Sequence, residues 1–313
     1  MSPAGPISSA METTPPAPGT TALAMGLTWA LVREMRDASV YDRTNLERAT
    51  GLPVLSTVPR VTGERLLFDR RLPAGEPSHT TALRQEVARE SFRGLVSDLR
   101  FIQHSMGRDG LKTLVVTSDG PGEGKTFTAC NLALAQAASG TRTALVDVDL
   151  RSGDASRYLG CAEHPGLHEV LTGELEVSEV LREVQLDPTG EARSITLLPA
   201  GKSGAESAAF LHGPRFADMI DVLSGLFECT IIDTPPISLF SEAVALGALA
   251  DGVVVVARSE VTDQSALSFT LERLRRTGAN VVGVVLNDAE IPGQYESYAS
   301  YYALPPGRSS ADG

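Results

Sequence analysis

The segment S-D-G-P-G-E-G-K-T, from Ser118 to Thr126, combines glycines with a lysine and a hydroxyl group in the order that surrounds a nucleotide phosphate. An apolar run at 113–117 precedes it and a helical pattern follows it, so the glycines fall in a strand-to-helix turn. Gly122 and Gly124 allow backbone N–H groups to converge on a phosphate, and the positive end of the helix dipole adds to the attraction. The pattern predicts a phosphate-binding loop.

The last two residues of this loop have defined chemistry. Lys125 can reach the β- and γ-phosphates, and the Thr126 hydroxyl can bind Mg²⁺. One departure is that Asp119 stands where the strict motif requires glycine. The predicted nucleotide-binding residues of the loop are Gly120, Pro121, Gly122, Glu123, Gly124, Lys125, Thr126 and Phe127.

Two other apolar runs end in aspartates. The sequence A-L-V-D-V-D-L-R contains Asp147 and Asp149, and T-I-I-D-T-P-P contains Asp233. Because side chains alternate along a strand, Asp147 and Asp149 lie on the same side of theirs. Carboxylates at strand ends beside a phosphate-binding loop suit Mg²⁺ binding and proton transfer. Taken singly, each aspartate could instead cap a helix or loop.

The elements that would position these groups alternate along the chain. Apolar, β-rich runs are separated by helical stretches, which predicts an α/β fold: a P-loop NTPase with a mostly parallel sheet and helices on both faces. The predicted strands are 113–117, 143–148, 195–198, 229–232, 252–257 and 281–286, and the predicted helices are 82–106, 126–139, 168–171, 216–227, 241–249 and 263–276. In such sheets ligands bind at the carboxyl ends of the strands, where the motifs fall.

The rest of the chain divides by composition. Residues 1–22 are rich in Pro, Ala, Thr, Ser and Gly and are expected to be disordered. Residues 23–80 contain a short helix, a strand-like stretch and a linker, whereas 81–290 form the P-loop domain and 291–313 a flexible tail. The apolar stretch 22–32 is about half of the ~20 residues that a membrane-spanning helix requires, so we expect a cytoplasmic protein.

The net charge and the spacing of the cysteines argue against two classes of function. The net charge of −12 is unfavourable for general nucleic-acid binding. The three cysteines are widely spaced and form no metal-ligand pattern, which indicates reduced thiols.

The tail carries four of the six tyrosines of the chain within eight residues: Tyr295, Tyr298, Tyr301 and Tyr302. Beside a nucleotide site, a polar segment of this kind is a candidate phosphoacceptor. The alternative is an aromatic strip that packs against a partner or a membrane surface.

Together these motifs resemble a known family. The segments P-G-E-G-K-T, V-D-V-D-L-R, I-I-D-T-P-P, D-G-V-V-V-V-A-R and G-V-V-L-N, followed by a tyrosine cluster, are similar to the bacterial tyrosine kinases (BY-kinases) of capsule and exopolysaccharide systems, over about residues 85–302. The resemblance implies ATP and Mg²⁺ as cofactors. It implies that Lys125 and Thr126 hold phosphate and metal, that Asp147 is the base or a metal-side carboxylate assisted by Asp149, and that Asp233 binds Mg²⁺ through water.

The resemblance also implies roles for two residues outside the three motifs, with Asn287 near the adenine and Arg151 at the nucleotide. It implies autophosphorylation of the tail, which we expect to occur in trans within a homo-oligomer and to regulate polymer export. Residues 23–59 resemble the cytoplasmic end of a polysaccharide chain-length determinant. The implied partners are that membrane-embedded transporter, which would hold the protein at the inner face of the membrane, and a protein-tyrosine phosphatase.

Some family features are altered, which leaves alternatives open. The oligomerisation motif E-x-x-R-x-x-R is present at Glu90 and Arg93, but Val96 replaces its second arginine, and a further family segment is reduced to E-S-A-A-F-L at 206–211. These changes put ring assembly in doubt and suit a non-catalytic adaptor. The related Min/Par ATPases, which are ATP-gated assembly switches, carry a lysine where this chain has Gly120 and lack a tyrosine cluster.

Overall fold

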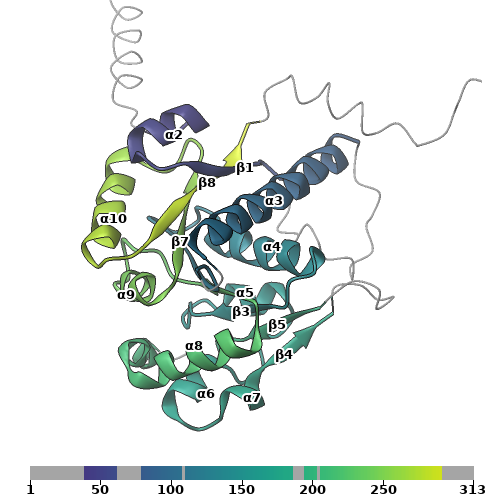
Figure 1. The fold of residues 1–313 in the computed structure, drawn as a ribbon, viewed down its shortest axis with the longest axis vertical. Helices are drawn as coiled ribbons and strands as arrows, with labels where there is room; N and C mark the ends of the chain where they lie inside the picture. The colour runs from purple at the N-terminus through teal and green to yellow at the C-terminus, as the bar shows by residue number, and fades with distance from the viewer. Residues whose placement is uncertain (1–38, 62–78, 108–109, 186–193, 203–204, 291–313) are drawn as a thin grey trace, which may run out of the picture. The chain divides into compact units, whose positions relative to one another are not determined.

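The computed structural model describes residues 39–61, 79–107, 110–185, 194–202 and 205–290. Its centre is an eight-stranded sheet with the order β1-β8-β7-β2-β6-β3-β5-β4 (Figure 1). The strands are β1 Val54–Pro59, β2 Thr113–Ser118, β3 Thr143–Asp147, β4 Arg182–Val184, β5 Ile195–Leu198, β6 Cys229–Asp233, β7 Gly252–Arg258 and β8 Val281–Ala289. All neighbouring strands are parallel except β4 and β5, which confirms the predicted α/β class.

Helices cover both faces of this sheet. They are α2 Arg43–Thr50, α3 His79–Met106, α4 Lys125–Ala138, α5 Asp154–Tyr158, α6 Leu167–Thr172, α7 Val177–Val180, α8 Pro214–Leu226, α9 Glu242–Leu249 and α10 Gln264–Arg276, with a 3₁₀ helix, η1, at Ala205–His212. The central strands read as continuous apolar runs because side chains on both of their faces are buried, as in β2 and β7. One apolar cluster includes residues of α3 and α4, and the other includes residues of α8, α9 and α10.

Strand register brings the three chemical motifs to one edge of the sheet. Asp147 at the end of β3 pairs with Asp233 at the end of β6, and Asp233 in turn pairs with Val116 of β2. The phosphate loop follows β2 directly. Because parallel strands end at the same edge, residues separated by more than 100 positions become neighbours there.

The sheet extends further towards the N-terminus than the sequence indicates. Sequence patterns group 23–80 apart from a domain that starts at 81, whereas β1 is the edge strand of the same sheet and pairs with β8 at Val54 and Val284. The predicted short helix is α2, which Asp42 caps by accepting a hydrogen bond from the Asn45 N–H at 2.8 Å. Both elements therefore add to the main body of the fold.

Other predictions lie outside the described residues: disorder at 1–22 and the flexible tail at 291–313. Within the described part, sequence patterns did not indicate the antiparallel edge strand β4 or the short helices α5 and α7, which are too short to show a helical period. None of the helices described here is both long and apolar enough to cross a bilayer.

Candidate nucleotide and phosphotransfer site

The phosphate loop has the backbone conformation that its glycines predict. Gly122 and Gly124 have φ of 74° and 95°, a region that L-residues with side chains rarely adopt. Gly124 also begins α4, where its carbonyl accepts a hydrogen bond from the Thr128 N–H at 2.9 Å. A Cβ atom on Gly124 would lie 1.9 Å from Asn287 Nδ2, so only glycine fits.

Glu123 points into the protein, although it lies inside the predicted nucleotide loop. Its carboxylate accepts hydrogen bonds from the Gly120 N–H at 3.1 Å and from the Thr262 hydroxyl at 2.6 Å. Burial raises its pKa, against the effect of these bonds. The Glu123 side chain therefore fixes the loop to the turn before α10, and only its backbone is available to a phosphate.

Three aspartates lie together with a lysine and a threonine at the centre of the site. We call these five residues the acidic cluster: Asp147, Asp149, Asp233, Lys125 and Thr126. Lys125 Nζ lies 3.7 Å from Asp149 Oδ2. The Thr126 hydroxyl, Asp147 Oδ1 and both carboxylate oxygens of Asp233 are buried and have no hydrogen-bond partner at normal distance and angle among the described residues, although the Thr126 hydroxyl lies close enough to Asp233 to lower its pKa slightly. Buried oxygens without partners are costly and rare, so this cluster is built for something other than folding.

The electrostatics of the two buried carboxylates are unfavourable for their charged forms. Burial raises the pKa of Asp147 to about 6, with a smaller contribution from the nearby Asp149 charge. Burial also raises the pKa of Asp233 well above its ordinary value; Asp147 adds to this shift and the Lys125 ammonium opposes it. A cation placed between these groups would favour both ionised forms.

The donor set fits Mg²⁺. Hydroxyl and carboxylate oxygens are the ligands that Mg²⁺ prefers, and the unpartnered oxygens of Thr126, Asp147 and Asp233 are of this kind. No three His, Cys, Asp or Glu side chains in the described ranges are arranged to hold a metal ion by themselves. That sparse protein contribution suits an ion that is bound largely by phosphates and water.

Ser156 is a site residue that sequence reasoning missed. Its N–H and its hydroxyl donate to Asp147 Oδ2 at 2.8 and 2.6 Å, which leaves Oδ1 free. The same hydroxyl accepts a hydrogen bond from the Ala200 N–H, after β5, at 3.0 Å. Because α5 is only five residues long, no sequence period marks Ser156; the contact exists only once β3, α5 and β5 are assembled.

Three predicted nucleotide residues make other contacts. Asn287 donates its amide N–H to the Glu123 carbonyl at 3.0 Å, so it supports the loop from β8. The Arg151 guanidinium lies 3.9 Å from the centre of the Phe240 ring. Phe127 is partly buried and packs edge-on against Phe92 of α3, with ring centroids 6.0 Å apart, so its side chain lies against the core. The predicted acceptor tyrosines lie outside the described residues.

Asp119, the departure from the strict loop motif, is tied into the fold. Its carboxylate accepts a hydrogen bond from the Thr270 hydroxyl of α10 at 2.6 Å, and its carbonyl accepts from the Ser238 hydroxyl at 2.6 Å. Where the strict motif has glycine, this chain thus has a side chain that anchors the start of the loop to α10.

The arginine cluster, which consists of Arg60, Arg258, Glu260 and Asp288, borders the other side of the loop. Asp288 accepts from Arg258 at 2.8 and 3.0 Å and from Arg60 Nε at 3.0 Å, and Arg60 also pairs with Glu260 at 3.4 Å. Arg258 donates in addition to the Gly122 carbonyl at 3.1 Å. These contacts join the ends of β1, β7 and β8 to the phosphate loop.

The altered oligomerisation motif lies on α3. Arg93 is half-exposed and pairs with Glu90 at 2.9 Å and Glu86 at 3.2 Å, whereas Val96 is 2% exposed and lies in the core. Position 96 therefore faces inwards, away from the surface that Glu90 and Arg93 occupy, and a charged arginine there would have to leave an apolar environment.

Comparisons with known proteins show which family the chain is similar to. A family model described as the CobQ/CobB/MinD/ParA nucleotide binding domain matches residues 114–304. Tyrosine-protein kinase ptk of Acinetobacter johnsonii is 30% identical over 268 residues, which cover 85% of this chain and 35% of ptk. Tyrosine-protein kinase CpsD of Streptococcus pneumoniae serotype 4 is 30% identical over 205 residues, which cover 65% of this chain and 86% of CpsD.

A similar solved structure is that of the chimerical protein CapA2B2, with a TM-score of 0.67 and 25% identity, covering 80% of this chain and all of the chimera. The share of each relative's length that this chain covers differs among these proteins. The chain spans about a third of ptk but most of CpsD and all of the chimera.

Proposed function

This chain belongs to the bacterial tyrosine kinases built on the CobQ/CobB/MinD/ParA nucleotide-binding domain, and from that premise we propose that it transfers the γ-phosphoryl group of ATP to tyrosines of its own tail. The proposed acceptors are Tyr295, Tyr298, Tyr301 and Tyr302. The observation that carries the proposal is the acidic cluster, where buried oxygens without partners adjoin Lys125 at the end of the phosphate loop.

Each residue of the cluster has a part in this chemistry. Mg²⁺ would supply positive charge to the phosphate oxygens, and the candidates to hold it are Thr126 and Asp233, because the one free oxygen of Asp147 is assigned to proton transfer below. Lys125 and the loop N–H groups neutralise the γ-phosphoryl group as it transfers. Asp149 lies beside Lys125 and orients its ammonium group.

The transfer requires a base because a tyrosine hydroxyl, with a pKa of about 10, is a poor nucleophile at pH 7. We assign this role to Asp147. Its Oδ1 is free and Ser156 fixes its orientation. The tyrosine oxygen bonds to the γ-phosphorus, the bond from that phosphorus to the β–γ bridging oxygen breaks, and Asp147 accepts the hydroxyl proton.

Phosphorylation would change the charge of the tail strongly. Each phosphate adds about −1.5 to −2, so four add about −6 to −8 to a chain whose net charge is already −12. Repulsion between such tails would loosen an oligomer. This gives a physical route to regulation of exopolysaccharide polymerisation and export, through a membrane-embedded transporter that holds the protein at the membrane and a phosphatase that resets the tail.

The test is to incubate the purified chain with Mg-ATP and to map phosphorylated sites by mass spectrometry. We expect phosphate on the four tail tyrosines and none in Lys125→Ala, which should lose at least about 100-fold in rate. Mixing Lys125→Ala with active chain tests transfer in trans, because phosphate on the inactive variant can come only from a neighbour.

An assembly switch of the Min/Par type predicts a different result. It would hydrolyse ATP and dimerise even when residues 295–302 are deleted, and the tyrosines would stay unmodified. Unmodified tyrosines in the active chain, together with no effect of Lys125→Ala, would reject the kinase proposal.

A further inference from the structure

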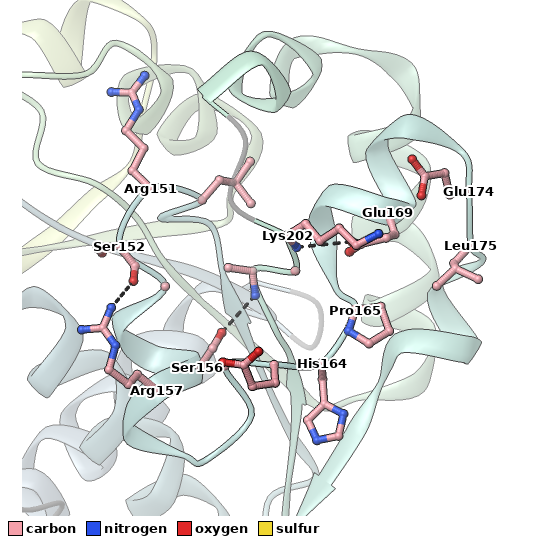
Figure 2. Close-up of a pocket in the computed structure, with 16 residues that line it drawn as sticks. Arg151, Ser152, Ser156, Arg157, His164, Pro165, Glu169, Glu174, Leu175 and Lys202 are labelled. Atoms are coloured by element: carbon pink, nitrogen blue, oxygen red, sulfur yellow. Dashed lines mark hydrogen bonds between the residues drawn. The ribbon is translucent and has the colours of Figure 1, made fainter.

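Pockets lie at both edges of the sheet. A pocket of about 700 Å³ at the carboxyl ends of β3 and β5 is lined by Ser156, which orients Asp147, and therefore belongs to the transfer site (Figure 2). A second pocket, of about 170 Å³, lies at the opposite edge, where the strands begin. None of its described lining residues comes from the phosphate loop or the acidic cluster, so the proposed reaction does not explain it.

Four elements meet at this second pocket, which we call the amino-edge pocket. Its lining residues come from the C-terminal half of α3, the start of β2, the end of α4 with the turn that follows, and the start of β6: Leu99, Arg100, Gln103, Leu111, Leu114, Gln136, Thr141, Glu228 and Cys229. The helix α4 begins at Lys125 and has 14 residues, which corresponds to about 21 Å. The amino-edge pocket therefore lies at the far end of the helix that starts in the acidic cluster.

The amino-edge pocket is small and has an apolar floor. Leu99, Leu111 and Leu114 are at most 3% exposed, and Cys229 is buried beside them. Burial raises the pKa of the Cys229 thiol to about 12, against the effect of the Arg100 charge, so the thiol is neutral at pH 7 and unsuited to metal binding or nucleophilic attack. Because an apolar cavity of about 150 Å³ holds one benzene ring, this pocket has room for a single six-membered ring and is too small for a nucleotide.

Arg100 places hydrogen-bond donors at the rim of the amino-edge pocket. Its Nη2 donates to the Ser139 carbonyl at 3.2 Å and to the Thr141 hydroxyl at 2.9 Å, which ties α3 to the end of α4. Its Nε and Nη1 have no acceptor, and its guanidinium pairs with no carboxylate, within the part of the chain that the structure describes. The guanidinium is thus held by one nitrogen and can donate to a ligand with the other two.

Two amide side chains add further donors and acceptors. Gln136 is 5% exposed; its Oε1 accepts a hydrogen bond from the Thr141 hydroxyl at 3.3 Å, whereas its Nε2 has no acceptor among the described residues. The side chain of Gln103, half-buried on α3, makes no hydrogen bond within the described ranges. A buried amide without a partner is costly, so these groups require water or a polar ligand.

The charges around the amino-edge pocket favour a neutral ligand. The charge of Arg100 is opposed by Glu228, whose Oε2 accepts from the Arg142 N–H at 2.9 Å and whose Oε1 has no partner in the described part of the chain. The last carbonyls of α4, at the negative end of its dipole, lie beside Arg100 and disfavour a phosphate. A hydroxyl group both donates and accepts, so adjacent hydroxyls of one ligand can pair with the guanidinium, amide and carboxylate groups together.

We propose that the amino-edge pocket binds one neutral monosaccharide ring, whose hydroxyl groups pair with Arg100, Gln136 and Glu228 and whose C–H face lies on the leucines of the floor. Such a ligand combines the three properties that the lining requires: the volume of one six-membered ring, several adjacent hydroxyls and no charge. The site is remote from the nucleotide, so the inference goes beyond the proposed phosphotransfer and does not depend on it.

The probes for the experiment are glucose, galactose and mannose, each added to the full-length chain and followed by saturation-transfer NMR and calorimetry. Mg-ADP is present throughout to occupy the phosphate loop. We expect at least one sugar to bind with a Kd of about 1 mM, the affinity that a ligand of this size reaches with ordinary efficiency. Absence of saturable binding of all three sugars at about 50 times that concentration would overturn the proposal.

Two variants test the location of binding, and a third is their control. Gln103→Trp fills the pocket from α3, and Gln136→Met removes the free amide at similar volume. Gln85→Trp is the control, because Gln85 is also half-buried on α3 and lies about five turns before Gln103, on the same face of the helix. We expect the Kd for the sugar to rise at least about tenfold in both pocket variants and to stay unchanged in the control.

The same measurements include the outcomes that reject the site. Equal sugar affinity of Gln103→Trp and Gln85→Trp would overturn the proposal. If circular dichroism shows that Gln103→Trp is unfolded, Gln136→Met decides instead, and a Kd equal to that of the unaltered chain rejects the site. Inorganic phosphate should not compete with the sugar, because Glu228 lines the pocket; competition would identify an anion site and would also overturn the proposal.

Discussion

The charged groups on the two sides of the phosphate loop differ in whether they have hydrogen-bond partners. In the arginine cluster, Asp288 accepts three hydrogen bonds from Arg60 and Arg258. In the acidic cluster, both carboxylate oxygens of Asp233 and one of Asp147 are buried without a partner among the described residues. The first arrangement stabilises the fold, whereas the second leaves desolvation uncompensated until a ligand arrives.

The difference shows which residues are present for function. A buried unpaired carboxylate lowers the stability of the folded chain, and such groups are retained where chemistry requires them. The arginine cluster supports the same loop from outside, through the bond from Arg258 to the Gly122 carbonyl. Substitutions in the acidic cluster should therefore lower activity more than stability, whereas substitutions in the arginine cluster should lower stability more than activity.

The largest expected effect is on activity, in Asp147→Asn. Loss of the base should lower tail phosphorylation about 10²- to 10⁴-fold, while the asparagine keeps an acceptor for Ser156. Removal of a buried charge should leave the unfolding free energy at pH 7 equal to that of the unaltered chain or higher. Phosphotransfer assays and urea denaturation measure the two quantities. A variant that loses stability together with activity would place Asp147 among the structural residues.

The next effect is on the pH dependence of stability without nucleotide and Mg²⁺. Burial raises the pKa of Asp147 from 3.8 to about 6 in the folded chain. The folded state then binds a proton that the unfolded state has lost, so this group contributes stability below its unfolded pKa that disappears as the pH rises through about 6. Comparing the unfolding free energies of the unaltered chain and Asp147→Asn between pH 4 and 7 isolates the contribution, which Asn lacks. Identical pH profiles would contradict the shift.

The smallest effect is expected on the opposite side of the loop, in Asp288→Ala. This change leaves Arg60 and Arg258 without their shared carboxylate and puts alanine at φ 58°. We expect a loss of about 1–2 kcal/mol in unfolding free energy and only a few-fold rise in the KM for ATP. Asp288→Asn, which tolerates the backbone angle, should lose less.

A suitable control for Asp288→Ala is Arg43→Ala, which breaks an exposed pair with Glu47 on α2. It should cost about 0.3–0.5 kcal/mol. If Asp288→Ala costs no more than this, the arginine cluster does not stabilise the loop, and the contrast between the two sides disappears.

Sequence patterns were most informative where local chemistry and periodicity coincide. The phosphate loop, the acidic strand ends and the predicted strands rest on residue types that have few alternative uses, and the structure places them as a parallel sheet with one shared edge. The direction of the Glu123 side chain could not be predicted from the sequence. Its motif position predicts a nucleotide contact, but its direction depends on Thr262, which is 139 residues away.

Contacts between distant segments also could not be predicted at the N-terminal edge strand of the sheet and around Ser156. The helix α2 and the strand β1 could be predicted from Gly51 and Pro59, but not their attachment to β8, because pairing between strands distant in sequence leaves no local pattern. Ser156 reaches Asp147 only because α5 folds against β3, and its hydroxyl also accepts a hydrogen bond from the Ala200 N–H, 44 residues away.

By itself, the sequence determined the order of the longer strands and helices, the phosphate loop and the identity of the acidic residues, since spacing along the chain is enough to define them. Only the tertiary structure decided which oxygens are left without partners and which charges are satisfied. The physical reason is that burial and hydrogen bonding depend on neighbours in space, and at this sheet edge those neighbours come from segments up to 228 residues apart.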